Sequence, residues 1–230
     1  LGGGDLSGGG KISGFHEPDR FVMALLRALA DVVVVGAGTL RGSTDHRWTP
    51  EHIHPRSAAS LGEWRTSMGL AAVPTTMFVT GSGEIPLGHG ALRDPGVPVV
   101  IATTASGAAR LARAALGDHV TVEATGTGTA LSAQDIVAIG AGLGARLILT
   151  EGGPHLLGQF VAADLLDELF LTLAPQVAGR GEGERLGLVE GVALSPPDMH
   201  WHELVSVRRS TDHLLLRYRR RGDRLQPRES

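Results

Sequence analysis

Two glycine-rich turns contain the residue types best suited to binding a phosphate group. The tetrapeptide G-A-G-T at 36–39 directly follows a run of four valines, and E-G-G-P at 151–154 lies between a predicted strand and a predicted helix. A turn without side chains lets backbone N–H groups approach a phosphate, and a helix beginning at Pro154 presents the positive end of its dipole to an anion. Two such turns at the carboxyl ends of buried strands predict a dinucleotide site between them.

Each turn also has a plainer interpretation. In the Rossmann fingerprint G-x-G-x-x-G, the third glycine would fall at position 41, which is Arg41 here. We expect a polar loop rather than a helix after Gly42. The E-G-G-P segment taken alone fits a capped strand-to-helix turn that binds nothing. A purely structural role is therefore the alternative for both turns.

The elements that must position these turns alternate between helix and strand. Strands are predicted over 32–35, 75–80, 97–103, 120–124, 146–150 and 168–174, and helices over 17–30, 105–116, 132–143 and 154–163. Residues 203–209 and 213–220 are predicted to pair as a hairpin. This order predicts an α/β fold with a mixed, mostly parallel sheet, antiparallel C-terminal strands and helices on both faces.

We expect one domain over residues 1–230, with a glycine-rich loop at 1–14 and a frayed tail at 221–230. The arginines at 217–224 alternate along the last strand, which predicts an edge strand protected from aggregation. The stretch 43–74 is polar and contains several prolines, so we expect an exposed loop there, with a short helix near Trp64 and Met68.

Composition excludes several classes of protein. The chain has 230 residues, 33 glycines, no cysteine and a formal charge of -3. Absent cysteine excludes disulfide scaffolds, thiolate zinc sites and the zinc-dependent deaminases, and the cytoplasm is the expected location. A near-neutral charge and 4% aromatic residues argue against nucleic-acid binding. The apolar window 21–40 contains Arg27 and Asp31, so no membrane span is expected.

Closely spaced histidines raise the possibility of a metal site. His46, His52 and His54 lie close together in the sequence, as do His200 and His202. Alternating histidines can chelate a metal, but the prolines and charges around them favour exposed loops. We therefore expect no metal.

Two longer strings resemble a known family. DVVVVGAGTLR at 31–41 and LILTEGGPHLLGQFVAADLLDELFLTLAPQVAGR at 147–180 closely resemble the pyrimidine reductase domain of riboflavin-biosynthesis enzymes and its stand-alone homologues. The resemblance covers about residues 15–220 and implies a dihydrofolate-reductase-like fold and a homodimer. It further implies NADPH-dependent reduction of a phosphoribosylamino-pyrimidine, with hydride transferred to the first carbon of the ring-opened ribose.

The resemblance also implies roles for individual residues. The cofactor diphosphate would be held by Gly36, Ala37, Gly38, Thr39, Gly152, Gly153 and Pro154. The adenosine half would lie along Thr80, Gly81, Ser82 and Thr103. Glu151 is predicted to orient the substrate or the nicotinamide ribose; the alternative is a carboxylate that accepts from nearby backbone N–H groups. Arg41, Arg180 and Arg185 are candidates for the substrate phosphate, against the alternative of solvated loop charges.

Three points of the resemblance leave alternatives open. The family's first strand, with its serine- and aspartate-containing turn, is expected upstream of Leu1. The stretch 42–74 is longer and richer in His and Trp than in the riboflavin enzymes proper, which favours a stand-alone, actinobacterial-type homologue. A pterin-like or dihydrofolate substrate is therefore one alternative, and a protein that binds NADP without turnover is another.

Overall fold

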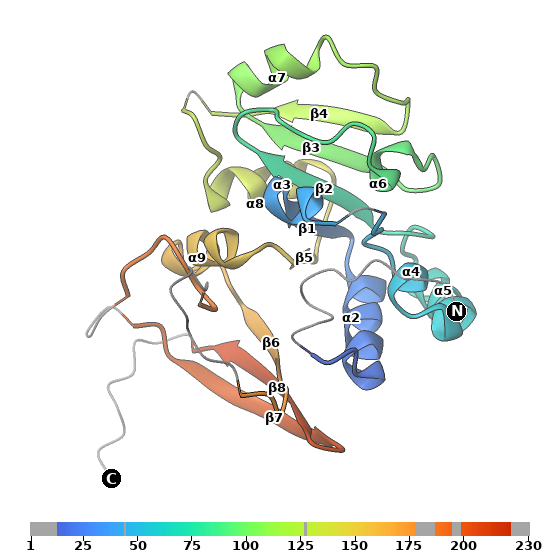
Figure 1. Ribbon diagram of the computed structural model, residues 1–230, viewed down its shortest axis with the longest axis vertical. Helices are drawn as coiled ribbons and strands as arrows, with labels where there is room; N and C mark the ends of the chain where they lie inside the picture. The colour runs from blue at the N-terminus through green and yellow to red at the C-terminus, as the bar shows by residue number, and fades with distance from the viewer. Residues whose placement is uncertain (1–12, 44, 127, 178–186, 195–198, 222–230) are drawn as a thin grey trace.

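Two separate sheets organise the chain (Figure 1). The structure is a computed structural model that describes residues 13–221 except 44, 127, 178–186 and 195–198. Five parallel strands form one sheet in the order β4-β3-β2-β1-β5, and three antiparallel strands form the other in the order β6-β8-β7. The predicted α/β fold class is thus confirmed, and the antiparallel C-terminal strands form a sheet of their own.

The strands lie close to their predicted positions. The parallel sheet contains β1 (Val32–Gly36), β2 (Thr75–Thr80), β3 (Val99–Thr103), β4 (Val120–Ala124) and β5 (Ile148–Thr150). The antiparallel sheet contains β6 (Glu168–Leu173), β7 (His202–Ser210) and β8 (His213–Arg220). The hairpin of β7 and β8 across residues 211–212 is as predicted.

The longer helices match the sequence pattern, and several short ones were not predicted. The helices are α2 (Glu17–Leu29), α3 (Ala37–Arg41), α4 (Pro50–Ile53), α5 (Ala58–Ser67), α6 (Gly90–Arg93), α7 (Ala105–Leu111), α8 (Ala133–Gly142) and α9 (Pro154–Ala162), with a 3₁₀ turn at Pro55–Ser57. The predicted capping box of α8 is present, because Ser132 Oγ accepts from the Asp135 backbone and the Asp135 carboxylate accepts from the Ser132 backbone. Helix α7 ends earlier than predicted, although Leu116 beyond it still packs against the core.

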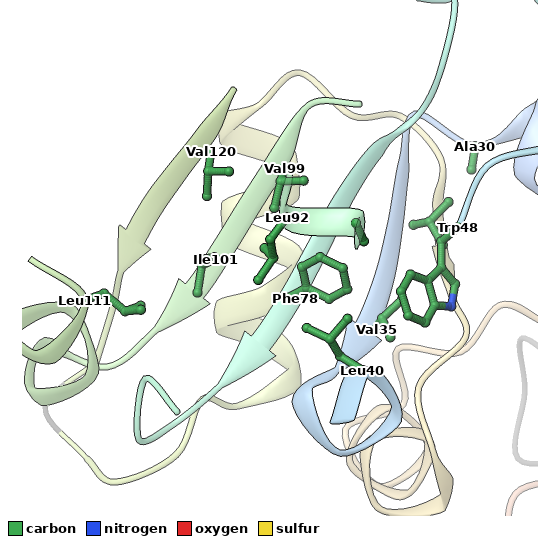
Figure 2. Packing of buried hydrophobic residues seen from close by; sticks show 12 residues of the cluster. Ala30, Val35, Leu40, Trp48, Phe78, Leu92, Val99, Ile101, Leu111 and Val120 are labelled. Carbon is green, nitrogen blue, oxygen red and sulfur yellow. The ribbon is translucent and has the colours of Figure 1, made fainter. Parts of the chain in front are cut away.

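The valine run in β1 is buried on both faces, which explains its lack of alternation. Val33 and Val35 pack into one core cluster with Phe78 and Trp48. Figure 2 shows Val35, Phe78 and Trp48 close together over β1 and β2. The other face of the sheet packs Val32 and Val34 against α8 and α9. Helices therefore cover both faces, as predicted.

In the stretch 43–74, the short helix expected near Trp64 and Met68 is present as α5, but the prediction of an exposed loop around the histidines was wrong. Trp48 is 3% exposed and forms an edge contact with Phe78, with ring centroids 5.4 Å apart. His46 and His54 are also buried, and α4 and α5 lie in this stretch. Met68 caps the end of α5. The reason is that Trp48 completes the core over β1 and β2, and its neighbours follow it into the interior.

The prediction that the last strand is an edge strand was also wrong. Strand β8 lies between β6 and β7, so both of its backbone edges are paired. Its arginines instead pair with carboxylates: Arg217 contacts Glu168 at 2.6 Å, and Arg220 contacts Asp164 at 2.9 Å. Hydrogen bonding to Arg217 lowers the pKa of Glu168. The alternating arginines are thus explained by cross-strand ion pairing.

Within the described ranges, no helix is both long and apolar enough to cross a membrane.

Candidate functional site

A cavity of about 500 Å³ lies at the carboxyl ends of β1, β2 and β5. We call it the β1–β5 cavity. It is lined by Gly36, Gly38, Thr39, Val79, Gly81, Ala130, Leu131, Gly153, Pro154, His155, Leu156 and Gln159. This volume is in the range of small-molecule sites, and the lining combines backbone groups with hydrocarbon side chains. Both glycine turns border this one cavity.

The position of the cavity follows from the strand order. From β1 the chain adds β2, β3 and β4 successively on one side, and then returns to place β5 on the other side. The loops after β1 and β5 consequently leave the sheet in opposite directions and open a crevice between them. Ligands of open α/β sheets bind at this switch point.

The glycines keep the cavity open. A Cβ built on Gly36 or Gly38 would meet no atom within 4 Å, and one built on Gly153 would meet only Thr39 Oγ1 at 3.8 Å. Helix α9 begins at Pro154, with Gly153 as its N-cap, no side-chain cap and no acidic residue in its first turn. Its first N–H groups therefore lack a side-chain acceptor, as a phosphate-binding terminus requires.

The first glycine of the E-G-G-P turn, Gly152, has a different role. A Cβ on Gly152 would lie 2.3 Å from Leu156 Cδ2, so glycine is needed there for close packing against α9. Gly81 is similar, because its Cβ would lie 2.3 Å from the Thr129 carbonyl oxygen. That contact brings residues 129–131 over the end of β2, where Ala130 and Leu131 form a wall of the cavity.

The remaining predicted residues lie outside the cavity lining. Thr80 and Thr103 are buried at the ends of β2 and β3. Ser82 Oγ accepts from the Glu84 backbone, and the exposed Arg41 donates to the Glu84 carbonyl oxygen at 3.3 Å. Ala37, Gly152 and Glu151 are also absent from the lining. Arg180 and Arg185 lie outside the described residues.

The first turn has one feature that was not predicted. The chain after Gly36 forms the short helix α3, whose Leu40 is buried in the core and which ends before Gly42. The position of the third glycine in the Rossmann fingerprint falls at the end of this helix. Arg41, at that position, is exposed at the end of α3.

Glu151 forms a buried ion pair with Arg27 of α2. Arg27 Nε donates to Oε1 and Nη2 to Oε2, both at 2.7 Å, and the side chains are 3% and 9% exposed. Both carboxylate oxygens are therefore engaged by one guanidinium in a bidentate pair. The pair ties the E-G-G-P turn to α2 and neutralises an acid that would repel a bound phosphate.

Arg27 also holds the segment that contains Trp48. Its Nη1 donates to the carbonyl oxygens of Arg47 and Thr49, and its Nη2 lies 3.1 Å from Nε2 of His46. Because arginine only donates, His46 Nε2 is the acceptor and carries no proton. The neighbouring His52 contacts the His46 ring edge-on. Burial, and then the charges of Arg27 and Arg47, lower the pKa of His52.

Sequence reasoning missed half of the cavity lining. Val79 was within a predicted strand, and Leu156 and Gln159 were within the predicted helix. No sequence pattern indicated that these side chains face a cavity. Ala130 and Leu131 come from a loop without a motif. His155 directly follows E-G-G-P, and its place in the first turn of a predicted helix was the available signal. Among the described residues, no group of three metal-ligating side chains is close enough to hold a metal.

A family model supports the assignment that this geometry suggests. The model of the RibD C-terminal domain matches residues 4–214. The chain belongs to this family. The resemblance found in the sequence is thereby confirmed, and the RibD C-terminal domain has the α/β fold described above.

Solved structures agree with the family. A pyrimidine reductase-like protein from Corynebacterium diphtheriae has a TM-score of 0.67 at 21% identity, over 88% of this chain and 80% of that one. RibD from Acinetobacter baumannii has a TM-score of 0.64 at 16% identity, over 90% of this chain and 51% of that one. The riboflavin biosynthesis reductase Rib7 from Saccharomyces cerevisiae has a TM-score of 0.55 at 14% identity, over 90% and 82%.

These likenesses establish the fold. The chain spans about half the length of the Acinetobacter RibD chain. No curated protein sequence matches it.

Proposed function

We propose that this chain is an NADPH-dependent reductase of a riboflavin-pathway phosphoribosylamino-pyrimidine or a related small molecule. The observation that carries the proposal is the β1–β5 cavity, which is bordered by two glycine turns at the switch point of a parallel sheet. Membership of the RibD C-terminal domain family supports it, since reductases of that family use NAD(P)H. The proposal includes two further points: the chain forms a single domain, and the protein is located in the cytoplasm.

The residues present fit a dinucleotide. Backbone groups of Gly38, Thr39 and Gly153 would hold the diphosphate, because a Cβ built on Gly38 meets no atom within 4 Å and one on Gly153 meets only Thr39 Oγ1 at 3.8 Å. The hydrocarbon groups of Val79, Leu131 and other lining residues give the cavity a largely apolar lining. When bound, the nicotinamide supplies a hydride, so the contribution of the chain is mainly binding and orientation.

The substrate would bind beyond the cofactor, with its phosphate held by arginine. Arg41, Arg180 and Arg185 remain the proposed residues for this phosphate. Glu151 is proposed to orient the substrate or the nicotinamide ribose. Its contribution would be indirect, because its ion pair with Arg27 fixes the position of the E-G-G-P turn. Thr80, Ser82 and Thr103 stay proposed neighbours of the adenosine.

The test is consumption of NADPH in the presence of the phosphoribosylamino-pyrimidine. We expect NADPH to be oxidised only when both compounds are present. The loss of NADPH absorbance measures this turnover. Parallel reactions contain a dihydropterin or dihydrofolate in place of the pyrimidine. Cofactor binding without consumption with any of these substrates would contradict the proposal and would favour a binding protein without turnover.

We further propose a homodimer formed through one face of the antiparallel sheet. The strand register places eight apolar side chains on this face: Leu169, Leu171, Leu173, Leu204, Val207, Leu214, Leu216 and Tyr218. We call it the apolar sheet face. All eight are half-buried or exposed, and Leu173, Leu204 and Val207 are each more than 45% exposed. The ion pairs of Glu168 lie on the opposite face.

A second copy of the chain is the occupant that fits this face. A three-stranded sheet needs a covered hydrophobic face to be stable, and monomers rarely expose a contiguous apolar patch of this kind. The apolar sheet face carries charge only at its ends, with Arg209 at one end and Arg220, which is paired with Asp164, at the other. Two copies would therefore meet about a two-fold axis without burying unpaired carboxylates.

Val207→Asp is expected to weaken dimerisation about tenfold or more, because it buries a carboxylate in the interface. Arg208→Asp is the matched control, since Arg208 is adjacent in β7 but lies on the opposite face. Sedimentation velocity over a range of concentrations measures the effect. A wild-type monomer at all concentrations, or equal dimerisation of the two variants, would contradict the proposed interface.

A further inference from the structure

His155 is the ionisable side chain that lines the β1–β5 cavity. The other lining residues are glycines, hydrocarbon side chains, Thr39 and Gln159, and none of them carries a charge. His155 is the second residue of α9 and belongs to the turn whose N–H groups lack a side-chain acceptor. Among the described residues that line the cavity, His155 is therefore the one side chain that could offer a positive charge to an anion.

A neighbouring segment fixes the place of the imidazole. The Glu190 backbone donates to the Pro154 carbonyl oxygen at 3.1 Å, so residues 187–191 pack against the first turn of α9. A Cβ built on Gly191, whose φ is +78°, would lie 3.1 Å from His155 Nδ1. The His155 ring consequently lies against the Gly191 backbone. A side chain at position 191 would reduce the space that the ring occupies.

The carboxylates on the elements packed against α9 are engaged elsewhere. Glu190 accepts a hydrogen bond from the Gly187 backbone. Asp135, in the first turn of α8, accepts from the backbone and the hydroxyl of Ser132. No described residue forms a hydrogen bond or ion pair with the His155 ring. The ring is thus available to a ligand.

The other charges near the two ends of α9 are neutralised in pairs. Glu151, just before the helix, is held by Arg27 at 2.7 Å. Asp164, just after the helix, is held by Arg220 at 2.9 Å. Across the cavity, Arg41 at the end of α3 is exposed and donates to a carbonyl oxygen. A proton on His155 would therefore add an uncompensated positive charge beside the first turn of α9, where that turn borders the β1–β5 cavity.

We propose that protonated His155 binds a phosphate oxygen of the ligand in the β1–β5 cavity and makes the affinity for that ligand rise as the pH falls. The inference rests on the proposed function, in which the ligand carries the diphosphate of NADPH. An imidazole gains its proton in mildly acidic solution, and a bound anion strengthens proton binding. By linkage, the same coupling strengthens anion binding when the proton is present.

The test is calorimetric titration of NADPH, NADH and ribose 5-phosphate into the wild type, H155Q and H155K. It is run at about pH 8.5, where an ordinary imidazole is neutral, and at about pH 6.5, where about half of it is protonated. NADH has the diphosphate without the 2′-phosphate, which itself titrates in this range. Ribose 5-phosphate represents the substrate phosphate without the diphosphate. We expect the wild type to bind NADH about three- to tenfold more tightly at the lower pH.

H155Q is expected to bind NADH equally at both pH values, and H155K to bind it tightly at both. A pH effect on ribose 5-phosphate that H155Q removes, with none on NADH, would assign the contact to the substrate phosphate. A pH dependence that H155Q retains for all ligands would overturn the inference while leaving the reductase proposal intact. If the wild type binds neither nucleotide, the proposed function fails, and the ribose 5-phosphate titration still decides the role of His155.

Discussion

Gly153→Phe is expected to weaken NADPH binding at least about 100-fold, equivalent to about 2.7 kcal/mol, while the protein stays folded. Gly153 has a φ of -67°, which any L-residue adopts, and a Cβ there would meet only Thr39 Oγ1 at 3.8 Å. The phenyl ring would therefore enter the β1–β5 cavity rather than the core. It would occupy the space between the two glycine turns and deny a diphosphate access to the N–H groups of α9.

The measurement is a titration of NADPH into the wild type and the variant, with thermal unfolding recorded for both. Gly88→Phe is the matched control, because Gly88 is exposed, has open space around a built Cβ and lies outside the cavity lining. It should bind NADPH like the wild type. Undiminished affinity in folded Gly153→Phe would show that the diphosphate does not lie between the turns.

Arg27→Ala is expected to lower the free energy of unfolding by about 3–5 kcal/mol, because it leaves the Glu151 carboxylate buried without its partner. The Glu151 side chain is 9% exposed, so water cannot replace the guanidinium fully. The carbonyl oxygens of Arg47 and Thr49 lose their donor in the same variant. Equilibrium unfolding in urea measures the loss.

Two further variants show whether charge is the cause. Arg56→Ala removes an exposed arginine that contacts Glu17 at 3.4 Å, and it should change the free energy of unfolding by less than about 0.5 kcal/mol. The double variant Arg27→Met with Glu151→Met leaves no unpaired charge and should be more stable than Arg27→Ala. A loss below about 1 kcal/mol for Arg27→Ala would contradict the structural role of the pair.

The features that depend on the local sequence pattern were predicted well. The unbroken valine run of β1 indicated a strand buried on both faces, and Val32 to Val35 indeed contribute to both core clusters. Glycine next to a strand end indicated a turn in both tetrapeptides. Their convergence on one cavity was predictable because the carboxyl ends of parallel strands meet at one edge of a sheet.

The features that depend on contacts distant in sequence were not predictable in this way. Glu151 pairs with Arg27, which lies 124 positions earlier in the sequence, and no sequence periodicity predicts such a partner. The acidic side chain of Glu151 would repel a phosphate at the neighbouring turn, and Arg27 neutralises it. Trp48 and His46 were assigned to an exposed loop because their neighbours are polar, but burial was decided by the space above β1 and β2.

The antiparallel sheet illustrates the same limit. Alternating arginines on β8 are compatible with a solvent-exposed edge strand or with ion pairing in a central strand. The order β6-β8-β7 decides between these, and it depends on residues 168–173 returning beside the hairpin. Glu168 on β6 then supplies the carboxylate that Arg217 and Arg219 contact.

A crystal structure of the protein with bound NADP⁺ tests the central claim most directly. We predict that the diphosphate lies in the β1–β5 cavity, within hydrogen-bond distance of backbone N–H groups in the G-A-G-T turn and the first turn of α9. Arg27 and Glu151 should remain paired behind it. A cofactor bound elsewhere on the molecule, with the cavity empty, would contradict the account.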